Sequence, residues 1–299
     1  MSDQQLFTIN DLATRDDLQQ LMELQALIFG DAPINHLNLP TLVSYIHNGQ
    51  HLLGVFSEQQ LFGYLIAYFG TYNRDTRRPA MANLKLVLER LGVHPDYRNI
   101  GLGTELATQL REIARKQAVR VITTAFSPLN SRMAYLLIRK LGAVIQYYHP
   151  DYYPDGMIED FATSTRGQLI AEWWVDRNRV EERLFGNRKA LTLEQYLDVV
   201  PIVNPTTGRE DLPIPTDKSY ELSSETMLLI EIPADYEALE QRDKELATVW
   251  CQHIQPVMFE VFSLGYVATD FLHDVHDGRL RSFYLMSYDG PQIRFEAEE

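Results

Sequence analysis

The pattern of apolar and polar residues over the first hundred positions predicts one helical layer followed by strands. Apolar residues recur at helical spacing from Asp11 to Phe29, and a weaker helical pattern covers residues 41–48. Two apolar runs rich in aromatic and branched residues flank residues 57–60, which is typical of a hairpin. A further strand is predicted over residues 84–93, where the sequence reads LKLVLERLGV.

The next fifty residues alternate between the apolar spacing of a helix and that of a strand. Residues from Thr104 onward have apolar positions at helical spacing, and residues 119–126 read as a strand. A helix is predicted over residues 131–141, closed by Gly142, and a strand over residues 143–149. Together these elements predict an α/β protein with a mixed, partly antiparallel sheet.

A second series of predicted strands and helices begins beyond residue 163. Strands are predicted over residues 169–176, 227–233, 266–274 and 280–288, with a proline-rich loop over 200–215. A single long helix is predicted over residues 235–264, kinked at Pro256. We therefore predict an N-terminal domain over residues 1–160 and a second, smaller α/β region over residues 165–299.

Composition and charge narrow the classes of partner. The 299 residues are 45% apolar and 23% charged, as in ordinary globular proteins. The net charge of −14 argues against nucleic acid or an anionic membrane as the main partner. The charge is uneven, because residues 1–160 carry −2 and residues 161–299 carry −12.

Localisation is predicted from three features. No apolar run approaches the roughly 18 residues of a membrane span, and the first residues are acidic, without a basic segment before an apolar one. The single cysteine, Cys251, has no partner for a disulfide or a zinc pattern. His36 and His94 also lack metal-ligand spacing, so we expect a cytoplasmic protein without a metal.

The six residues Arg98 to Gly103, RNIGLG, stand between a predicted strand and a predicted helix. Glycines at a helix start leave backbone N–H groups exposed at the positive end of the helix dipole, and such a helix start can bind phosphate. A dinucleotide fingerprint needs a third glycine where Leu106 stands, and a Walker A loop needs a lysine where Thr104 stands. Both of these phosphate sites are therefore excluded.

The stretch Val93-x-Pro95-x-Tyr97-Arg98-x-x-Gly101-x-Gly103 resembles the signature of the GNAT acyltransferases. The order of elements over residues 5–155 is similar too, including a helix that closes in Lys-Leu-Gly at residues 140–142. The resemblance implies a GNAT fold with acetyl-CoA or another acyl-CoA as co-substrate, its pyrophosphate held by the turn. The alternative is a turn with a structural role alone. The residues implied in binding acyl-CoA are Leu91, Val93, Arg98, Asn99, Ile100, Gly101, Leu102, Gly103, Thr104 and Asn130.

Acyl transfer to an amine needs a base, a polarised carbonyl and a proton for the leaving thiolate. The resemblance implies that the backbone of residues 91–93 contacts the thioester carbonyl. Glu89 on the same strand is the candidate base, directly or through a water, and a surface ion pair is its alternative role.

The proton donor departs from the family pattern. Members commonly place a tyrosine four residues before the Lys-x-Gly glycine, but here that position is Ile138, which has no proton to give. Tyr135 is the candidate in its place, with packing against the sheet as the alternative. Asn130 either positions a bound group or caps the helix that follows it.

We therefore expect an acyl-CoA-dependent N-acyltransferase that acts on the amine of a small molecule. The resemblance extends to larger predicted GNAT proteins through residues 172–174, Glu-Trp-Trp, which makes an amino-acid N-succinyltransferase using succinyl-CoA one alternative. A catalytically inactive acyl-CoA-binding module is the other. The acidic C-terminal region, for which a second GNAT-like half is one alternative, is expected to select a cationic acceptor, or else to act as a solubilising or homodimer-forming appendage.

Overall fold

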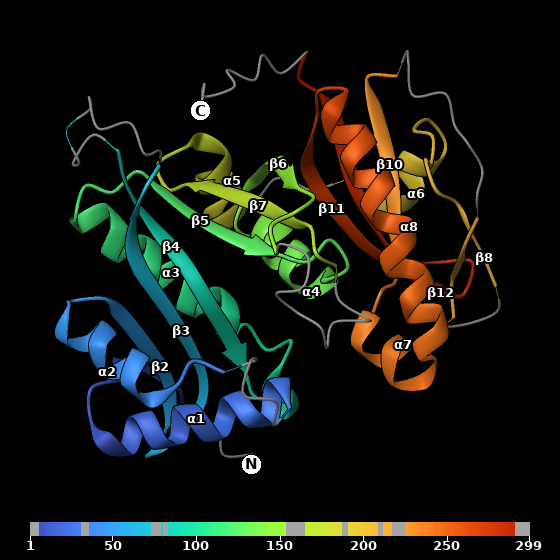
Figure 1. Ribbon diagram of the computed structural model, residues 1–299. Helices are drawn as coiled ribbons and strands as arrows, with labels where there is room; N and C mark the ends of the chain where they lie inside the picture. The colour runs from blue at the N-terminus through green and yellow to red at the C-terminus, as the bar shows by residue number, and fades with distance from the viewer. Residues whose placement is uncertain are drawn as a thin grey trace. The chain divides into compact units, whose positions relative to one another are not determined.

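The computed structural model describes residues 6–30, 36–72, 79, 83–153, 165–186, 191–208, 212–216 and 225–290. The chain forms two compact units, one of residues 1–124 with 174–176 and one of residues 125–173 with 177–299 (Figure 1). Each unit combines helices with strands, which confirms the predicted α/β class. Within the described ranges, no helix is both long enough and apolar enough to cross a membrane.

The first unit contains a mixed sheet. Its strands lie in chain order, and neighbouring strands are antiparallel except for the parallel pair β4 and β5. The strand predicted over residues 84–93 is confirmed with the same bounds. The strands are β1 (Thr8–Asp11), β2 (His51–Ser57), β3 (Gln60–Thr71), β4 (Leu84–Val93) and β5 (Val121–Phe126), of which β5 contributes its residues up to Thr124 to this unit.

Helices cover both faces of this sheet. The helices α1 (Arg15–Phe29) and α2 (Leu39–His47) pack on the face that carries the buried Tyr64. The adjacent Gly63 faces the other way, and a Cβ there would lie 3.6 Å from Leu106 of α3 (Leu102–Lys116). The sheet of the first unit is therefore enclosed between α1 and α2 on one side and α3 on the other.

The first helix begins four residues later than predicted. Thr14 caps α1 by accepting from the Asp17 backbone N–H, while the Asp17 carboxylate accepts from the Thr14 backbone N–H. The residues before it form β1, which pairs with β2 from Thr8 to Asp11. This reciprocal cap fixes where the strand ends and the helix begins.

The segment 174–176 joins the first unit through α3. The fully buried Arg111 donates from Nε to the Val175 carbonyl at 2.8 Å. The Val175 N–H donates to the Arg120 carbonyl at 3.1 Å, and Arg115 pairs with Asp176 at 3.1 Å. These contacts explain why three residues from much later in the chain belong to this unit.

The second unit contains an antiparallel sheet with strand order β7-β6-β11-β12-β10. The domain division predicted between residues 160 and 165 falls in the chain between β6 and β7, which pair with each other, and it stays a prediction. The strands are β6 (Val144–His149), β7 (Gln168–Trp174), β10 (Met227–Ile232), β11 (Tyr266–His276) and β12 (Arg279–Tyr288), with a separate pair β8 (Thr206–Thr207) and β9 (Ile214–Pro215).

The helices of the second unit differ from prediction in two places. The single helix expected over residues 235–264 is wrong, because Asp243 ends one helix and caps the next by accepting from the Leu246 N–H at 2.9 Å. The second of these helices runs on past Pro256. Two short helices before β8, α5 and α6, were not predicted. The helices are α4 (Ser131–Ala134), α5 (Asn178–Phe185), α6 (Leu193–Leu197), α7 (Tyr236–Arg242) and α8 (Lys244–Ser263).

The helix predicted over residues 131–141 is an α-helical turn followed by a π-helix, η4 (Tyr135–Lys140). Its wider turn is visible in the Leu141 N–H, which donates to the Leu136 carbonyl five residues back. Because π-helical turns inside helices occur often at functional sites, this segment is notable on geometry alone.

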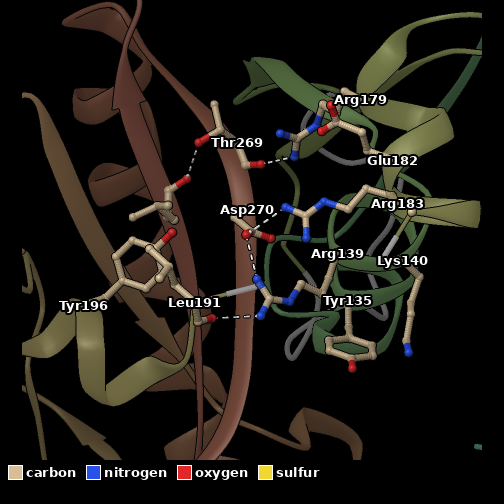
Figure 2. Close-up of a pocket in the computed structure, with 12 residues that line it drawn as sticks. Tyr135, Arg139, Lys140, Arg179, Glu182, Arg183, Leu191, Tyr196, Thr269 and Asp270 are labelled. Atoms are coloured by element: carbon tan, nitrogen blue, oxygen red, sulfur yellow. Dashed lines mark hydrogen bonds and ion pairs between the residues drawn. The ribbon is translucent and has the colours of Figure 1, made fainter. Parts of the chain in front are cut away.

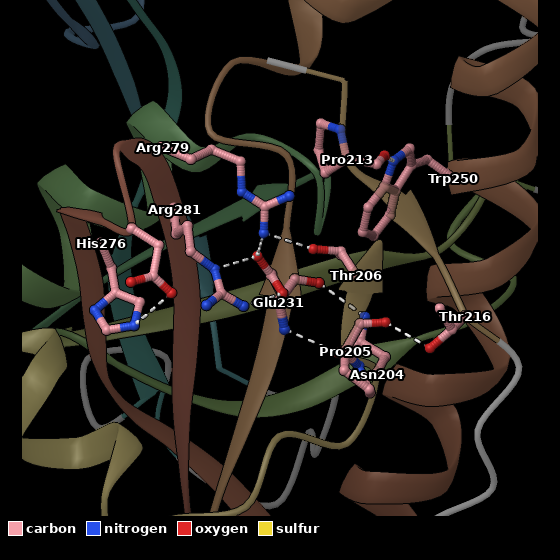
Figure 3. Close-up of polar contacts among 11 residues, drawn as sticks. Asn204, Pro205, Thr206, Pro213, Thr216, Glu231, Trp250, His276, Arg279 and Arg281 are labelled. Atoms are coloured by element: carbon pink, nitrogen blue, oxygen red, sulfur yellow. Dashed lines mark hydrogen bonds and ion pairs between the residues drawn. The ribbon is translucent and has the colours of Figure 1, made fainter. Parts of the chain in front are cut away.

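A buried ionic cluster anchors the segment before β8 to β10 (Figure 3). The Glu231 carboxylate is 2% exposed and accepts from Arg281 at 2.8 and 2.7 Å and from Arg279 at 3.1 Å. Arg279 also donates to the Thr206 hydroxyl at 2.8 Å, and the Asn204 amide bonds both backbone groups of Glu231. One carboxylate thus connects two strands and a loop.

Candidate functional site

The strand β4 loses its parallel partner halfway along its length. It pairs with β3 along its whole length, but with β5 only at Leu86↔Ile122 and Val87↔Thr123. Within the described part of the chain, residues 88–93 have no pairing with β5. Backbone groups along an unpaired strand edge are available to an extended ligand, as in strand addition.

A β-bulge lies where β4 leaves β5. Ile66 pairs with Arg90 and the next residue, Ala67, pairs with Leu88, so Glu89 is the extra residue on β4. Bulges redirect side chains and are frequent beside active sites. The predicted base therefore stands at the beginning of the unpaired edge.

Glu89 is half-buried, and its carboxylate lies near Tyr45 of α2. Burial, followed by the nearby Glu89 carboxylate, raises the pKa of Tyr45. The Tyr45 ring lies 5.9 Å from the ring of Tyr68 between centroids. A carboxylate beside an aromatic ring suits the binding of an amine, since both the charge and the ring face attract a cation.

The turn predicted to hold phosphate has open backbone geometry. Asn99 and Gly101 have φ angles of 65° and 104°, and Gly101 is the N-cap of α3 without a side-chain cap bond. The N–H groups of Thr104 and Glu105 donate to the Gly101 carbonyl at 2.9 and 3.1 Å. The N–H groups of residues 101–103 precede them, at the positions that a helix start leaves to a ligand. A Cβ at Gly101 would meet nothing within 4 Å, so the approach is open.

Packing holds the residues that lead into this turn. The Phe62 and Tyr97 rings lie 4.4 Å apart between centroids, and Phe7 contacts both rings edge-on. His94 accepts from the Asp96 N–H at 3.3 Å, and Arg98 donates from Nε to the Val93 carbonyl at 3.3 Å. The turn is therefore supported before any ligand binds, which lowers the ordering cost of binding.

The other two predicted site residues belong to the second unit. Asn130 caps α4 by accepting from the Met133 N–H at 3.0 Å. Tyr135 begins η4, with the Lys140 ammonium 5.5 Å from its ring centroid and the His273 ring 5.7 Å away. Ile138 is fully buried. The first unit thus contains Glu89, residues 91–93 and the turn, the second unit contains Asn130 and Tyr135, and the roles of all these residues in the reaction stay predictions.

The second unit contains a cavity that was not predicted from the sequence (Figure 2). Arg139 of η4 and Arg179 and Arg183 of α5 contribute to its lining. The only available signal was the four-residue spacing of Arg179 and Arg183, which places both on one helix face. That signal needed the helix α5, and α5 was not predicted.

Residues 18–143 match the model of the Acetyltransferase (GNAT) family. The match confirms the predicted resemblance to the GNAT acetyltransferases over this part of the chain, and it supports the class of acyl-CoA-dependent N-acyltransferases. The matched residues include β4, its bulge and the turn, and they end just after η4.

Several solved structures are similar in fold. The ribosomal-protein-S18-alanine N-acetyltransferase from Escherichia coli is 16% identical, with a TM-score of 0.44 over 57% of this chain and 96% of that one. Naa20 from Chaetomium thermophilum, in complex with a bisubstrate analogue, is 16% identical, with a TM-score of 0.45 over 61% and 94%. A GNAT family acetyltransferase from Elizabethkingia anophelis with acetyl-CoA bound is 12% identical, with a TM-score of 0.40 over 56% and 97%. No curated protein sequence matches the chain.

Proposed function

We propose that the protein transfers an acetyl or other short acyl group from acyl-CoA to the amine of a small molecule. The proposal rests on one observation in the first unit. Among the described residues, the side of β4 that faces β5 is unpaired from Leu88 to Val93, and the strand leads through residues 94–100 into a helix start without a side-chain cap. An extended acyl-thioester arm needs the first feature, and a pyrophosphate needs the second.

The chemistry assigns a role to each group. The amine nitrogen attacks the thioester carbonyl carbon, a C–N bond forms and the C–S bond breaks. Glu89 accepts the proton that the amine loses, directly or through a water. Backbone N–H groups of residues 91–93 stabilise the developing oxyanion. The CoA thiolate takes a proton from Tyr135, which we propose because Ile138 has none to give.

A second candidate function is acyl-CoA binding without transfer. The observation that favours it is Ile138, which is apolar and fully buried at the position where GNAT proteins commonly have a tyrosine. A protein without a proton donor would still have the phosphate-binding turn and the open edge of β4, and would therefore still bind the co-substrate.

One experiment separates these functions. The full chain is incubated with acetyl-CoA or succinyl-CoA and an amine panel of amino acids, polyamines, aryl amines and short peptides, and free thiol is measured. Amine-dependent thiol release supports transfer, and the faster donor identifies the acyl group. Calorimetric CoA binding without thiol release supports the binding module. Absence of both overturns the assignment of the turn.

The same panel tests the acceptor. We propose that residues 165–299 favour a cationic amine, because residues 161–299 carry a net charge of −12. Polyamines should then be acylated faster than neutral aryl amines, with a preference that weakens as salt rises. Equal rates for both classes at low salt would remove the acidic region from acceptor selection.

A further inference from the structure

The second unit contains a cavity of about 520 Å³ whose lining shares only Tyr135 with the residues of the proposed acyl transfer. Its walls come from η4, α5, α6 and β11, with Leu191 and Leu285 beside them. This volume lies within the range of small-molecule sites, about 300 to 1,000 Å³. The cavity is therefore large enough for a metabolite.

The lining carries an excess of positive charge. Four basic side chains, Arg139, Lys140, Arg179 and Arg183, line the cavity with two acidic ones, Glu182 and Asp270. The whole chain has a net charge of −14, so the charge of this lining is opposite in sign to that of the chain. Positive charge collected around one concave surface attracts an anion more strongly than the same charges spread over the protein.

One carboxylate stands between two of the guanidinium groups. Asp270 Oδ2 accepts from Arg139 at 2.6 Å and from Arg183 at 2.8 Å, while Oδ1 accepts from the Phe271 N–H at 2.8 Å. Figure 2 shows both guanidinium groups pointing at Asp270 from the same side. A single negative charge balances one guanidinium, so the pair retains a net positive charge at the cavity wall.

These guanidinium groups also have donor capacity for a ligand. Among the described acceptors, Arg183 donates only to Asp270, and Arg139 donates to Asp270 and to the Leu191 carbonyl at 2.9 Å. A guanidinium has five N–H donors in a fork that matches a carboxylate or a phosphate. The exposed fractions of the Arg139 and Arg183 side chains, 17% and 21%, leave them accessible but partly desolvated.

A structural role accounts for Arg179 but not for the whole set. Arg179 donates to the carbonyls of Gly142 and Thr269, which ties α5 to β11. Lys140 is exposed and stands over the Tyr135 ring at 5.5 Å, so it adds charge at the cavity without holding elements together. Beside these cations, the apolar part of the lining consists of Tyr135, Tyr196, Leu191 and Leu285.

We propose that this cavity binds a small organic oxyanion, a carboxylate or phosphate attached to an apolar or aromatic body. The oxyanion sits against Arg139, Arg183 and Lys140, and the body packs on the tyrosine and leucine walls. The site lies entirely in the second unit and does not depend on the acyl-transfer proposal.

The test is isothermal titration calorimetry of the full chain with four matched probes. Phenylacetate and phenyl phosphate carry the two oxyanions, phenylacetamide is the neutral counterpart and benzylamine the cationic one. Saturable one-to-one binding of at least one anion, without binding of the amide or the amine, is expected. No saturable binding of either anion, or equal binding of the amide, overturns the proposal.

Variants locate the site. Arg183→Gln should weaken anion binding about 10- to 100-fold, the effect of losing a hydrogen bond between charged groups. Lys140→Gln, at an exposed position, should weaken it several-fold and keeps the test decisive if Arg183→Gln does not fold. Lys244→Gln removes an exposed charge of the same unit away from the cavity and should leave affinity unchanged. Unchanged affinity in every folded cavity variant, or an equal loss in Lys244→Gln, refutes the assignment.

The readout is also independent of turnover. Anion binding in a chain that releases no thiol would leave this proposal standing and overturn acyl transfer alone. Acyl transfer without anion binding would do the reverse. Anion affinity that vanishes at saturating CoA would show that the probes occupy the co-substrate site, which contradicts a separate site in the second unit.

Discussion

Replacing Glu231 by glutamine tests how much the buried ionic cluster stabilises the second unit. Glutamine has nearly the same shape, so the variant Glu231→Gln removes charge without creating a large cavity. It also places amide N–H donors against guanidinium donors. Arg279 and Arg281 are 16% and 13% exposed, so little water is available to compensate them.

The magnitude follows from that burial. Removing one partner of a buried ion pair costs about 3 to 5 kcal/mol, because the remaining charge is left uncompensated. Glutamine retains one acceptor oxygen, so we expect the lower end, about 3 kcal/mol. With a urea m-value of about 2 kcal/mol/M, this corresponds to a midpoint shift of about 1.5 M.

Urea denaturation of the full chain checks the shift, with tryptophan fluorescence as the probe. Trp250 reports on the second unit, since its Nε1 donates to the Pro213 carbonyl at 2.7 Å. Glu237→Gln is the matched control, because Glu237 pairs with Arg132 at the surface, where the two side chains are 56% and 43% exposed. That pair should contribute less than about 1 kcal/mol. Equal shifts for both variants would refute the argument from burial.

Three further outcomes are expected. Gly101→Ala should weaken CoA binding about tenfold or more by calorimetry, because its Cβ enters the approach to the turn; Gly49→Ala, at φ 71° in open space elsewhere in the first unit, carries a similar backbone strain of about 1 to 2 kcal/mol and should bind CoA normally. Glu89→Gln should lower turnover by about 10² to 10⁴ with nearly unchanged CoA affinity, and full activity from pH 6 to 9, a range around neutral operating conditions, would remove Glu89 from the mechanism. Burial raises the pKa of the Cys251 thiol to about 11, so at about pH 8 its thiolate fraction is roughly two-hundredfold below that of a free cysteine; iodoacetamide should label it quickly only in urea, and rapid labelling of the folded chain would contradict its burial.

The first unit was largely predictable because its elements carry strong local signals. The hairpin β2–β3 and the strand β4 are long, apolar and bounded by turn residues, and the turn at Gly101 has a recognisable signature. The bulge at Glu89 and the loss of pairing after Val87 were not predictable, since both depend on partner strands distant in the sequence. The identity of a candidate base was therefore available from sequence, but its position at the strand split was not.

The elements that were not predicted from the sequence also have physical explanations. The strand β1 is four residues long and mostly exposed, so it lacks an apolar alternation, and α5 has only Val180 buried. The break at Asp243 had a readable signal, an aspartate one residue before a helix start, whereas Pro256, where a kink was predicted, lies inside the second helix. In the cavity of the second unit, the contributing residues come from elements spread between positions 135 and 285, a range that no local pattern spans.

The contact between Arg111 and Val175 has a consequence for the order in which the protein folds during synthesis. Arg111 lies in α3, yet the carbonyl to which its Nε donates belongs to a residue made 64 positions later. A nascent chain that has emerged only as far as β5 therefore has all five strands of the first sheet but lacks this acceptor for a fully buried cation. The first unit reaches its final stability only after β7 and the turn beyond it have left the ribosome. Truncation of the gene anywhere before the codon for Val175 should accordingly yield a first unit that is more easily degraded than the same unit in the full chain.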